Sequence, residues 1–358
     1  MNEAFWRNKR VLITGHTGFK GSWLSLWLSM VGARVAGFAL TSPTTPSLYG
    51  LTRLDDLVES KISDIRDLAR LERVVDDVAP EVVFHMAAQS VVLRSYESPV
   101  DTYSTNVMGT VNILEAIRRT NRGCTVVNVT TDKCYENRGW VWGYRESDRL
   151  GGHDPYSNSK ACAELVGQAY RDSFFPVKDH GRHGVGLASA RAGNVIGGGD
   201  WTPYQLVPEA VEALLRGNPV ILRHPEAIRP WQHVLDCLDG YLCLAEHLAG
   251  DPLTFSSEWN FGPADGDSRP VSYLVELLAK HWGVAVPWVH DTQVRPPEAQ
   301  ELRLETRKAA SLLGWRPRWP IDTALDMVAR WYDGHHAGSD PRTLCLEQIG
   351  RYMVHASE

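Results

Sequence analysis

The sequence predicts an α/β protein: a doubly wound parallel sheet followed by a smaller, mostly helical C-terminal lobe. Two observations carry this prediction. Apolar strand patterns alternate with helical patterns through the first 190 residues, and this alternation stops after Arg191. Repeated strand–helix units favour a parallel sheet with helices on both faces and ligands at the carboxyl ends of its strands.

The first unit joins a strand, a glycine-rich turn and a helix. Residues 10–14 form a short, branched apolar run, as a buried parallel strand requires. The turn holds Gly15, Gly18 and Gly21, and residues 22–30 continue it with apolar side chains at helical spacing. The glycines permit a tight turn and close backbone approach, and the helix N-terminus attracts negative charge. This Rossmann-type order is the one that a dinucleotide pyrophosphate needs.

Later elements follow the same pattern. Further strands are predicted at 35–40, 81–87, 125–130 and 185–190, with helices at 67–78, 99–119 and 154–174. The strand at 125–130 runs into the triplet Thr131-Asp132-Lys133, so the sequence predicts reacting groups at that end of the sheet.

Beyond Arg191 the pattern changes to a glycine-rich loop at 194–201 and helices at 205–216, 234–248, 271–282 and 321–332. Short polar and Pro-rich pieces separate these helices. We therefore expect a dinucleotide-binding domain with the catalytic residues at 1–190, and a substrate-binding lobe at 191–358 that caps the carboxyl edge of the sheet.

Composition excludes several classes of protein. The chain has 358 residues, 43% of them apolar and 22% charged, as in a soluble globular protein of about two domains. A net charge of −6 without a long basic run argues against a nucleic-acid partner. The N-terminus has no segment of signal-peptide form, and glycines and Lys20 interrupt its first apolar region, so we expect no membrane association. Six cysteines without a C-x-x-C pair suggest free thiols and a cytoplasmic location, and 13 histidines without ligand spacing suggest no metal.

Tyr156 and Lys160 are four residues apart and hence neighbours on one helix face. A phenol has a pKa of about 10, and lowering it by roughly three units requires about 4 kcal/mol. An adjacent ammonium and the positive nicotinamide ring could supply this free energy in a site poor in water. Thr131 can orient the same substrate hydroxyl. Together these residues can oxidise an alcohol, although the Tyr–Lys spacing alone also fits an ordinary surface pair.

Asp132 and Lys133 need another explanation, because hydride transfer does not require them. They can perform acid–base elimination beside a newly formed ketone, where the adjacent proton is acidic. A solvated loop pair or a helix cap is the alternative.

At this point the chain resembles a known family. The spacing G-x-x-G-x-x-G is that of the extended short-chain dehydrogenases/reductases, and within them the chain resembles the nucleotide-sugar 4,6-dehydratases, most closely the CDP-glucose 4,6-dehydratases. The stretches that carry the resemblance are 15–24, 87–89, 105–110, 131–137, 191–201 and 229–234.

The resemblance implies a reaction and its residues. CDP-D-glucose would become CDP-4-keto-6-deoxy-D-glucose and water. Tyr156 would take the C4 hydroxyl proton with Thr131 and Lys160 in support, and Asp132 would protonate the departing C6 hydroxyl. Lys133 stands where other sugar 4,6-dehydratases carry the Glu that removes the C5 proton, and it would have to be neutral to do the same.

The resemblance also implies NAD as the cofactor, although the second predicted strand ends without the acidic residue that often binds the ribose. The expected cofactor-binding residues are Gly15, Thr17, Gly18, Phe19, Lys20, Gly21, Asp64, Ile65, Ala87, Ala88, Asn106, Tyr156 and Lys160. The expected substrate-binding residues are Gln89, Asn194, Arg229 and Arg295, and solvated or capping roles are the alternative for the last three.

Two other functions remain open. A nucleotide-sugar 4-epimerase would share Thr131, Tyr156 and Lys160 but would not need Asp132-Lys133. A non-catalytic dinucleotide sensor would not need Tyr156 and Lys160. We also expect a homodimer built on helices 99–119 and 154–174, through Val100, Val107, Ile113, Ala161, Leu165 and Ala169, unless these residues are all intramolecular core.

Overall fold

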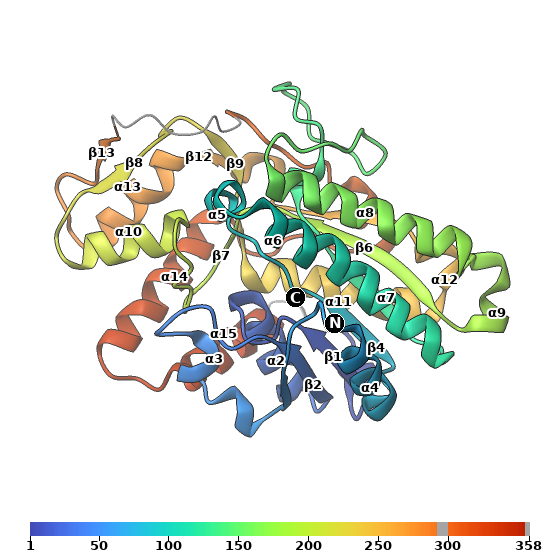
Figure 1. Ribbon diagram of the computed structural model, residues 1–358. Coiled ribbons are helices and arrows are strands. Elements are labelled where there is room, and N and C mark those ends of the chain that lie inside the picture. Colours follow the sequence, from blue (N-terminus) through green and yellow to red (C-terminus); the bar gives the residue numbers. More distant parts are fainter. Residues whose placement is uncertain (292–299, 355–358) are drawn as a thin grey trace.

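A seven-stranded parallel sheet forms the centre of the molecule (Figure 1). The computed structural model describes residues 1–291 and 300–354. The strand order is β11-β6-β5-β4-β1-β2-β3, which confirms the predicted fold class. These strands are β1 (Arg10–Thr14), β2 (Arg34–Ala39), β3 (Glu59–Ile62), β4 (Val82–His85), β5 (Thr125–Val129), β6 (Gly186–Ala192) and β11 (Glu258–Phe261).

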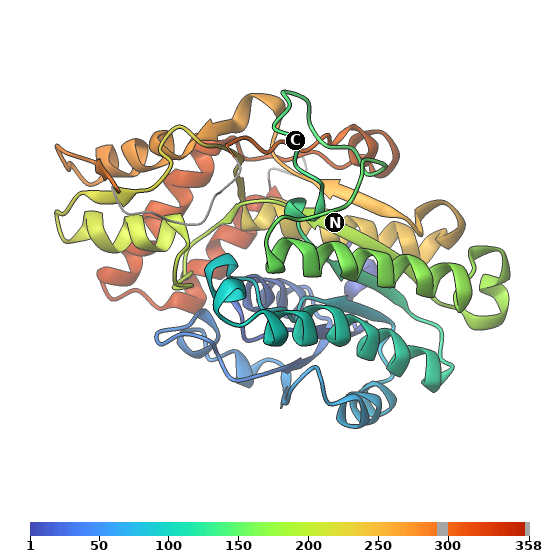
Figure 2. The ribbon, with the colours of Figure 1, turned by 45° about the horizontal axis from the view of Figure 1, so that its top comes forward.

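Helices cover both faces of the sheet (Figures 1 and 2). One face packs on α2 (Phe19–Met30) and α11 (Val234–Gly250), and the other packs on α4 (Leu68–Val78), α7 (Gly109–Thr120) and α8 (Pro155–Ser173). Side chains along a strand alternate between the two cores: Val11 and Ile13 belong to the first, and Leu12 to the second. The strands are therefore buried on both faces, which explains their continuous apolar runs.

Most of the remaining elements build the second lobe or link the sheet layers. The longer helices are α10 (Leu206–Leu215), α13 (Val271–His281), α14 (Ile321–His336) and α15 (Pro341–Val354). The short helices are α1 (Glu3–Trp6), α3 (Leu48–Leu51), α5 (Val92–Glu97), α6 (Pro99–Tyr103), α9 (His180–His183) and α12 (Pro252–Phe255). The short strands are β7 (Val195–Ile196), β8 (Val220–Leu222), β9 (Ile228–Pro230), β10 (Gln232–His233), β12 (Ser268–Pro270) and β13 (Trp288–His290), and they pair as β7–β10, β9–β12 and β8–β13.

The sheet layer takes two elements from the second half of the chain. β11 pairs with β6 as an edge strand, and α11 packs against β5 and β6. The division of the chain at residue 190 stays a prediction, but the sheet itself continues past it. The C-terminal helix α15 also returns to the first domain, where the Tyr352 and Trp27 ring centroids lie 5.6 Å apart.

The predicted helix at 99–119 is interrupted. A π-helical turn, Ser104–Met108, separates α6 from α7 and contains Asn106. Such turns often occur at functional sites. Over the described ranges, none of the helices is long and apolar enough to cross a membrane, and no group of three or more metal-ligating side chains comes together.

Candidate active site

The glycine turn between β1 and α2 leaves no room for side chains at two positions. Gly15 has φ +80°, and a Cβ atom there would lie 2.8 Å from the Ala87 backbone nitrogen. At Gly21 a Cβ atom would lie 2.2 Å from the Gly15 carbonyl oxygen. Gly18 is the N-cap of α2 and has no side chain to accept the first helical N–H groups. The turn therefore presents backbone donors and a positive helix end to an anion, which fits a dinucleotide pyrophosphate.

The catalytic candidates meet where β5 ends and α8 begins. Thr131 caps a 3₁₀ turn, Asp132–Cys134: its hydroxyl accepts from the Lys133 N–H at 3.3 Å and donates to Asp132 Oδ1 at 3.1 Å. Tyr156 and Lys160 lie on the first turns of α8 and are both buried. Lys160 Nζ donates to the Val129 carbonyl at 3.1 Å, which ties the helix to the end of the strand.

Burial sets the proton affinities of these groups. It lowers the pKa of Lys160 to about 8, with a further contribution from the charge of Lys20. It raises the pKa of the Tyr156 phenol above its ordinary value, while the Thr131 hydroxyl acts in the opposite direction. The pKa of Asp132 is raised by burial, against the attraction of Lys133 and Arg229. Asp132 is therefore suited to hold a proton that it can donate.

The second carboxyl oxygen of Asp132 is available for a substrate. Asp132 is 1% exposed, and its Oδ2 has no hydrogen-bond partner within the described part of the chain. Gly193 lies directly against this oxygen, because a Cβ atom at Gly193 would be 2.1 Å from it. Buried polar atoms are nearly always paired in native proteins, so an unpaired acid oxygen here points to a ligand group.

The remaining expected cofactor residues surround the glycine turn. Thr17 Oγ1 donates to the Leu40 carbonyl at 2.9 Å, and the Phe19 ring packs beside Gly197. Lys20 Nζ lies 3.5 Å from the Tyr241 hydroxyl. Asp64 accepts hydrogen bonds from the Arg66 side chain.

Ile65 and Asn106 make close contacts around the π-helical turn and the start of α7. Ile65 is buried against Gly109, where a Cβ atom would meet its side chain at 2.9 Å. Asn106 accepts from the Gln89 N–H at 2.8 Å and donates to the Gln89 carbonyl at 3.0 Å and to Ser159 Oγ at 2.8 Å. The π-helical turn thus holds the half-buried Ala87-Ala88 stretch and Gln89 next to α8.

The four expected substrate residues differ in their surroundings. The Gln89 amide is engaged internally, because it donates to Thr102 Oγ1 at 2.9 Å and accepts from the Val91 N–H at 2.7 Å. Asn194 Oδ1 is buried without a partner among the described residues. Arg229 donates to the Ile228 carbonyl at 2.9 Å, and its charge reaches Asp132. Arg295 lies outside the described residues.

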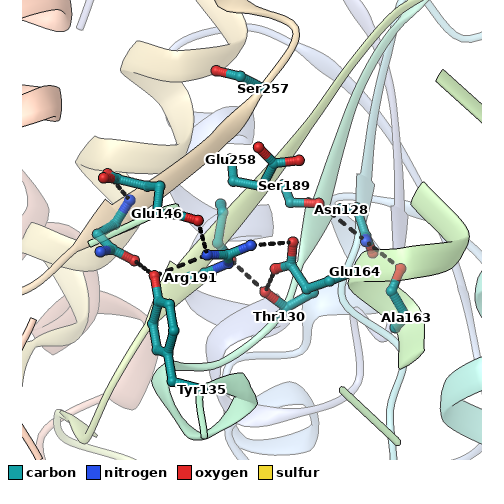
Figure 3. A network of polar contacts seen from close by, with 12 residues as sticks. Asn128, Thr130, Tyr135, Glu146, Ala163, Glu164, Ser189, Arg191, Ser257 and Glu258 are labelled. Carbon is teal, nitrogen blue, oxygen red and sulfur yellow. Dashed lines mark hydrogen bonds and ion pairs between the residues drawn. The ribbon is translucent and has the colours of Figure 1, made fainter. Parts of the chain in front are cut away.

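Three residues around the catalytic candidates were not predicted as site residues, although Arg191 and Gly193 lie in the stretch 191–201 that carries the family resemblance. Gly193 packs on Asp132, and Glu164 and Arg191 form a buried ion pair under the same segment (Figure 3). A signal was present for the pair: Glu164 is one helical turn beyond Lys160, and Arg191 ends an apolar strand. Glu164 and Arg191 are charged residues on two buried elements, and each therefore needs a partner of opposite charge.

Fold and site together define an enzyme class that pairs dinucleotide-dependent alcohol oxidation with an acid for elimination. The sequence model of the GDP-mannose 4,6-dehydratase family matches residues 12–328. The CDP-glucose 4,6-dehydratase of Salmonella typhimurium is 50% identical over 353 residues, which cover 99% of this chain and 98% of that protein. The chain therefore belongs to the 4,6-dehydratase family.

More distant relatives share the same architecture. The dTDP-glucose 4,6-dehydratase of Streptomyces antibioticus is 29% identical, covering 92% of this chain and 94% of that one. The crystal structure of the dTDP-glucose 4,6-dehydratase of Bacillus anthracis in complex with NAD superimposes with a TM-score of 0.77 at 22% identity, covering 93% and 99% of the two chains. UDP-glucose 4-epimerase of Thermotoga maritima with UDP-glucose gives 0.78 at 24% identity, covering 91% and 99%.

Proposed function

We propose that the chain is a CDP-glucose 4,6-dehydratase that converts CDP-D-glucose to CDP-4-keto-6-deoxy-D-glucose and water with NAD as cofactor. The observation that carries this proposal is the buried Asp132, which lies close to the buried Tyr156 and has one carboxyl oxygen without a partner among the described residues. The 50% identity to the Salmonella enzyme over nearly the full length supports the choice of CDP-glucose.

The chain's own residues divide the proton transfers among three carbons of the sugar. Tyr156 removes the C4 hydroxyl proton, and Thr131 and the Lys160 cation stabilise the phenolate. Lys133 removes the C5 proton that the C4 ketone has made acidic, and Asp132 gives a proton to the C6 hydroxyl, which leaves as water. Lys133 then returns its proton to C5, and the proton that Tyr156 took from the C4 hydroxyl replaces the one that Asp132 gave, so that all three groups are restored.

NAD fits the turn between β1 and α2. Gly15, Gly18 and Gly21 would hold its pyrophosphate at the start of α2, where no side chain competes. NAD bound there would supply the hydride acceptor for oxidation at C4 and the hydride donor for reduction at C6. Burial of Tyr156 and Lys160 excludes water from the same end of the sheet.

The test is incubation of the NAD-loaded protein with CDP-glucose, UDP-glucose, dTDP-glucose or GDP-mannose. Products are measured by the alkali-dependent absorbance of 4-keto-6-deoxy sugars. CDP-glucose should be converted best, without stoichiometric release of NADH, because the hydride returns to the sugar. Net NADH production would instead identify a simple dehydrogenase, and a change of configuration at C4 without loss of water would identify an epimerase.

The proposed enzyme is also a homodimer through α5, α6, the π-helical turn and α8. Large apolar side chains are exposed along these elements, from 36% to 81% of their surface: Tyr96, Val100, Tyr103, Met108 and Leu165. The sequence-based prediction of this interface was wrong for two residues. Ile113 and Ala161 are buried in the core of the chain itself and cannot contact a partner.

A further inference from the structure

A buried polar network lies beneath residues 130–135, on the face of the sheet that α8 covers (Figure 3). Its centre is the ion pair between Arg191 Nη2 and Glu164 Oε2, 3.0 Å apart, with side chains 2% and 1% exposed. Glu164 Oε1 also accepts a hydrogen bond from the Thr130 hydroxyl. Arg191 Nη1 donates to the Tyr135 hydroxyl and to the Glu146 carbonyl, both at 2.9 Å.

These contacts join two parts of the active site. Glu164 lies on α8, one turn beyond Lys160 and two turns beyond Tyr156. Thr130 and Tyr135 stand at the two ends of the stretch that carries Thr131, Asp132 and Lys133. The network therefore fixes both ends of the segment that carries Asp132, and it connects them to α8, the helix that carries Tyr156.

The far end of the segment is fixed twice. The Tyr135 hydroxyl donates to Asn260 Oδ1 on β11 at 2.7 Å, and the Arg191 guanidinium lies 5.0 Å from the Tyr135 ring centroid. Asn260 in turn donates to the Tyr144 carbonyl at 2.8 Å. The planar guanidinium of Arg191 donates to the Tyr135 hydroxyl, the Glu146 carbonyl and the Glu164 carboxylate at the same time. A lysine could not reproduce this geometry.

Stability does not by itself explain such a pair. A buried ion pair loses much of its attraction to desolvation, and well-packed apolar side chains often replace it at no cost. Its contacts instead fix distances. In elimination the acid and the base must address neighbouring carbons of one sugar ring, and a displacement of about 1 Å can cost roughly 100-fold in rate.

We propose that Glu164 and Arg191 are positioning residues: they hold segment 131–134 in register with α8, so that Asp132 reaches the C6 oxygen while Tyr156 contacts the C4 hydroxyl. This inference rests on the proposed function. It predicts that damage to the network slows elimination more than oxidation, because Tyr156 and Lys160 remain fixed on a long packed helix.

The experiment is single-turnover absorbance of enzyme-bound NADH after mixing the NAD-loaded enzyme with CDP-glucose. Three variants weaken the network by different amounts: Tyr135→Phe, Arg191→Lys and Glu164→Gln. Elimination should slow at least 10-fold in Glu164→Gln and less in Tyr135→Phe, while the formation of NADH changes only a few-fold. Bound NADH should therefore accumulate in each variant.

A matched control uses a tyrosine hydroxyl near the other end of the same helix. Tyr170 on α8 donates to Glu115 Oε2 on α7 at 3.3 Å, so Tyr170→Phe removes a hydroxyl as Tyr135→Phe does. In this control, the ratio of the oxidation rate to the elimination rate should equal that of the parent enzyme. Thermal melting of each variant, measured in parallel, reports any general loss of stability.

The outcomes separate the two proposals. Equal slowing of oxidation and elimination in Tyr135→Phe, which loses only a hydroxyl, would contradict a positioning role, as would NADH accumulation in Tyr170→Phe to the same extent. If the parent enzyme forms no 4-keto-6-deoxy product from CDP-glucose, the proposed function fails, and this inference fails with it.

Discussion

At the scale of single residues, the two carboxyl oxygens of Asp132 have different environments. Oδ1 is held by the Thr131 hydroxyl, and Oδ2 is buried against Gly193. This asymmetry fixes the direction in which the carboxyl group points, and burial raises its pKa, which favours the protonated form. Tyr156 and Lys160 form a separate pair on α8, so base and acid can be altered one at a time.

Tyr156→Phe should lose most of the dehydratase activity while the fold and NAD binding survive. The phenol is the group placed to deprotonate the C4 hydroxyl, and loss of a general base typically costs about 100- to 10,000-fold. Steady-state turnover of CDP-glucose measures the effect, and circular dichroism checks the fold. Activity within a few-fold of the parent would assign the base to another residue.

Asp132→Asn should separate the two half-reactions. The amide keeps the shape of the side chain but cannot donate a carboxylic proton, so C4 oxidation should persist while loss of water slows. Absorbance of enzyme-bound NADH in a single turnover should rise and then decay slowly. A parallel fall in both steps would refute this division between Tyr156 and Asp132.

Gly193→Ala should lower activity at least about 100-fold, the typical contribution of a general acid, by displacing the Asp132 carboxylate. The added methyl carbon would lie 2.1 Å from Asp132 Oδ2, far inside contact distance. Gly350→Ala is the control, because a methyl group there enters open space. Turnover and thermal melting of both variants should be compared, and full activity of Gly193→Ala would show that Asp132 can move without consequence.

The sequence predicted some of these residues and not others, for a physical reason. Tyr156 and Lys160 are linked by helical periodicity, which is local and can be read directly. Glu164 and Arg191 meet because α8 packs on β6, and this packing is not encoded in any short stretch. Gly193 matters through one close contact, which also depends on tertiary structure.

At the scale of elements, periodicity predicted five of the seven strands of the sheet and most of the long helices, with end-points that mostly differ by one or two residues; it gave no range for β3 or for the helix α15. It did not predict β11, because Glu258–Phe261 is short and lies among helices, without the alternation that indicated the other strands. The π-helical turn at Ser104–Met108 also lies within an unbroken helical pattern. β11 and the π-helical turn lie beside the candidate site, where tertiary contacts override local preference.

The contact between α11 and α15 should make the free energy of unfolding depend on pH. On α11, Asp236 Oδ1 accepts from the Arg318 N–H and the Tyr352 hydroxyl, each at 2.7 Å, and so links α11 to α15. Burial raises the pKa of Asp236 from 3.8 to about 7. The folded state therefore binds this proton more tightly than the unfolded state, and the stabilisation present at low pH is lost as pH rises towards 7.

Asp236→Asn should remove that dependence, because the amide resembles the protonated acid at every pH. From pH 5 to pH 7, the free energy of unfolding of the variant should improve relative to the parent by about 2 kcal/mol. Urea unfolding of both proteins at the two pH values measures this difference. An identical difference at pH 5 and pH 7 would show that Asp236 is ionised throughout.

At the scale of the whole molecule, the two halves of the chain meet at Asp132. Asp132 and Tyr156 come from the first half, whereas Gly193, which lies against the Asp132 carboxyl, and Arg229, whose charge acts on it, come from the second. The edge strand β11 and the helix α11 extend this sharing into the sheet itself. A boundary read from the change in sequence pattern therefore marks where alternation stops, while the sheet continues beyond it.

Exposed apolar side chains on α6 and α8 predict that the protein is a dimer. Val100 and Leu165, 81% and 53% exposed, lie on α6 and α8, which pack side by side. A stable dimer needs about 800 Å² from each partner, with apolar residues at its centre. Light scattering at micromolar concentration should give twice the chain mass of 40.0 kDa.

Leu165→Glu should shift the measured mass towards that of the monomer, because the dimer would bury an unpaired charge. Ile221→Glu, at an exposed apolar residue on β8 in the second lobe, should leave the dimer intact, and a parent mass near that of one chain would rule the dimer out.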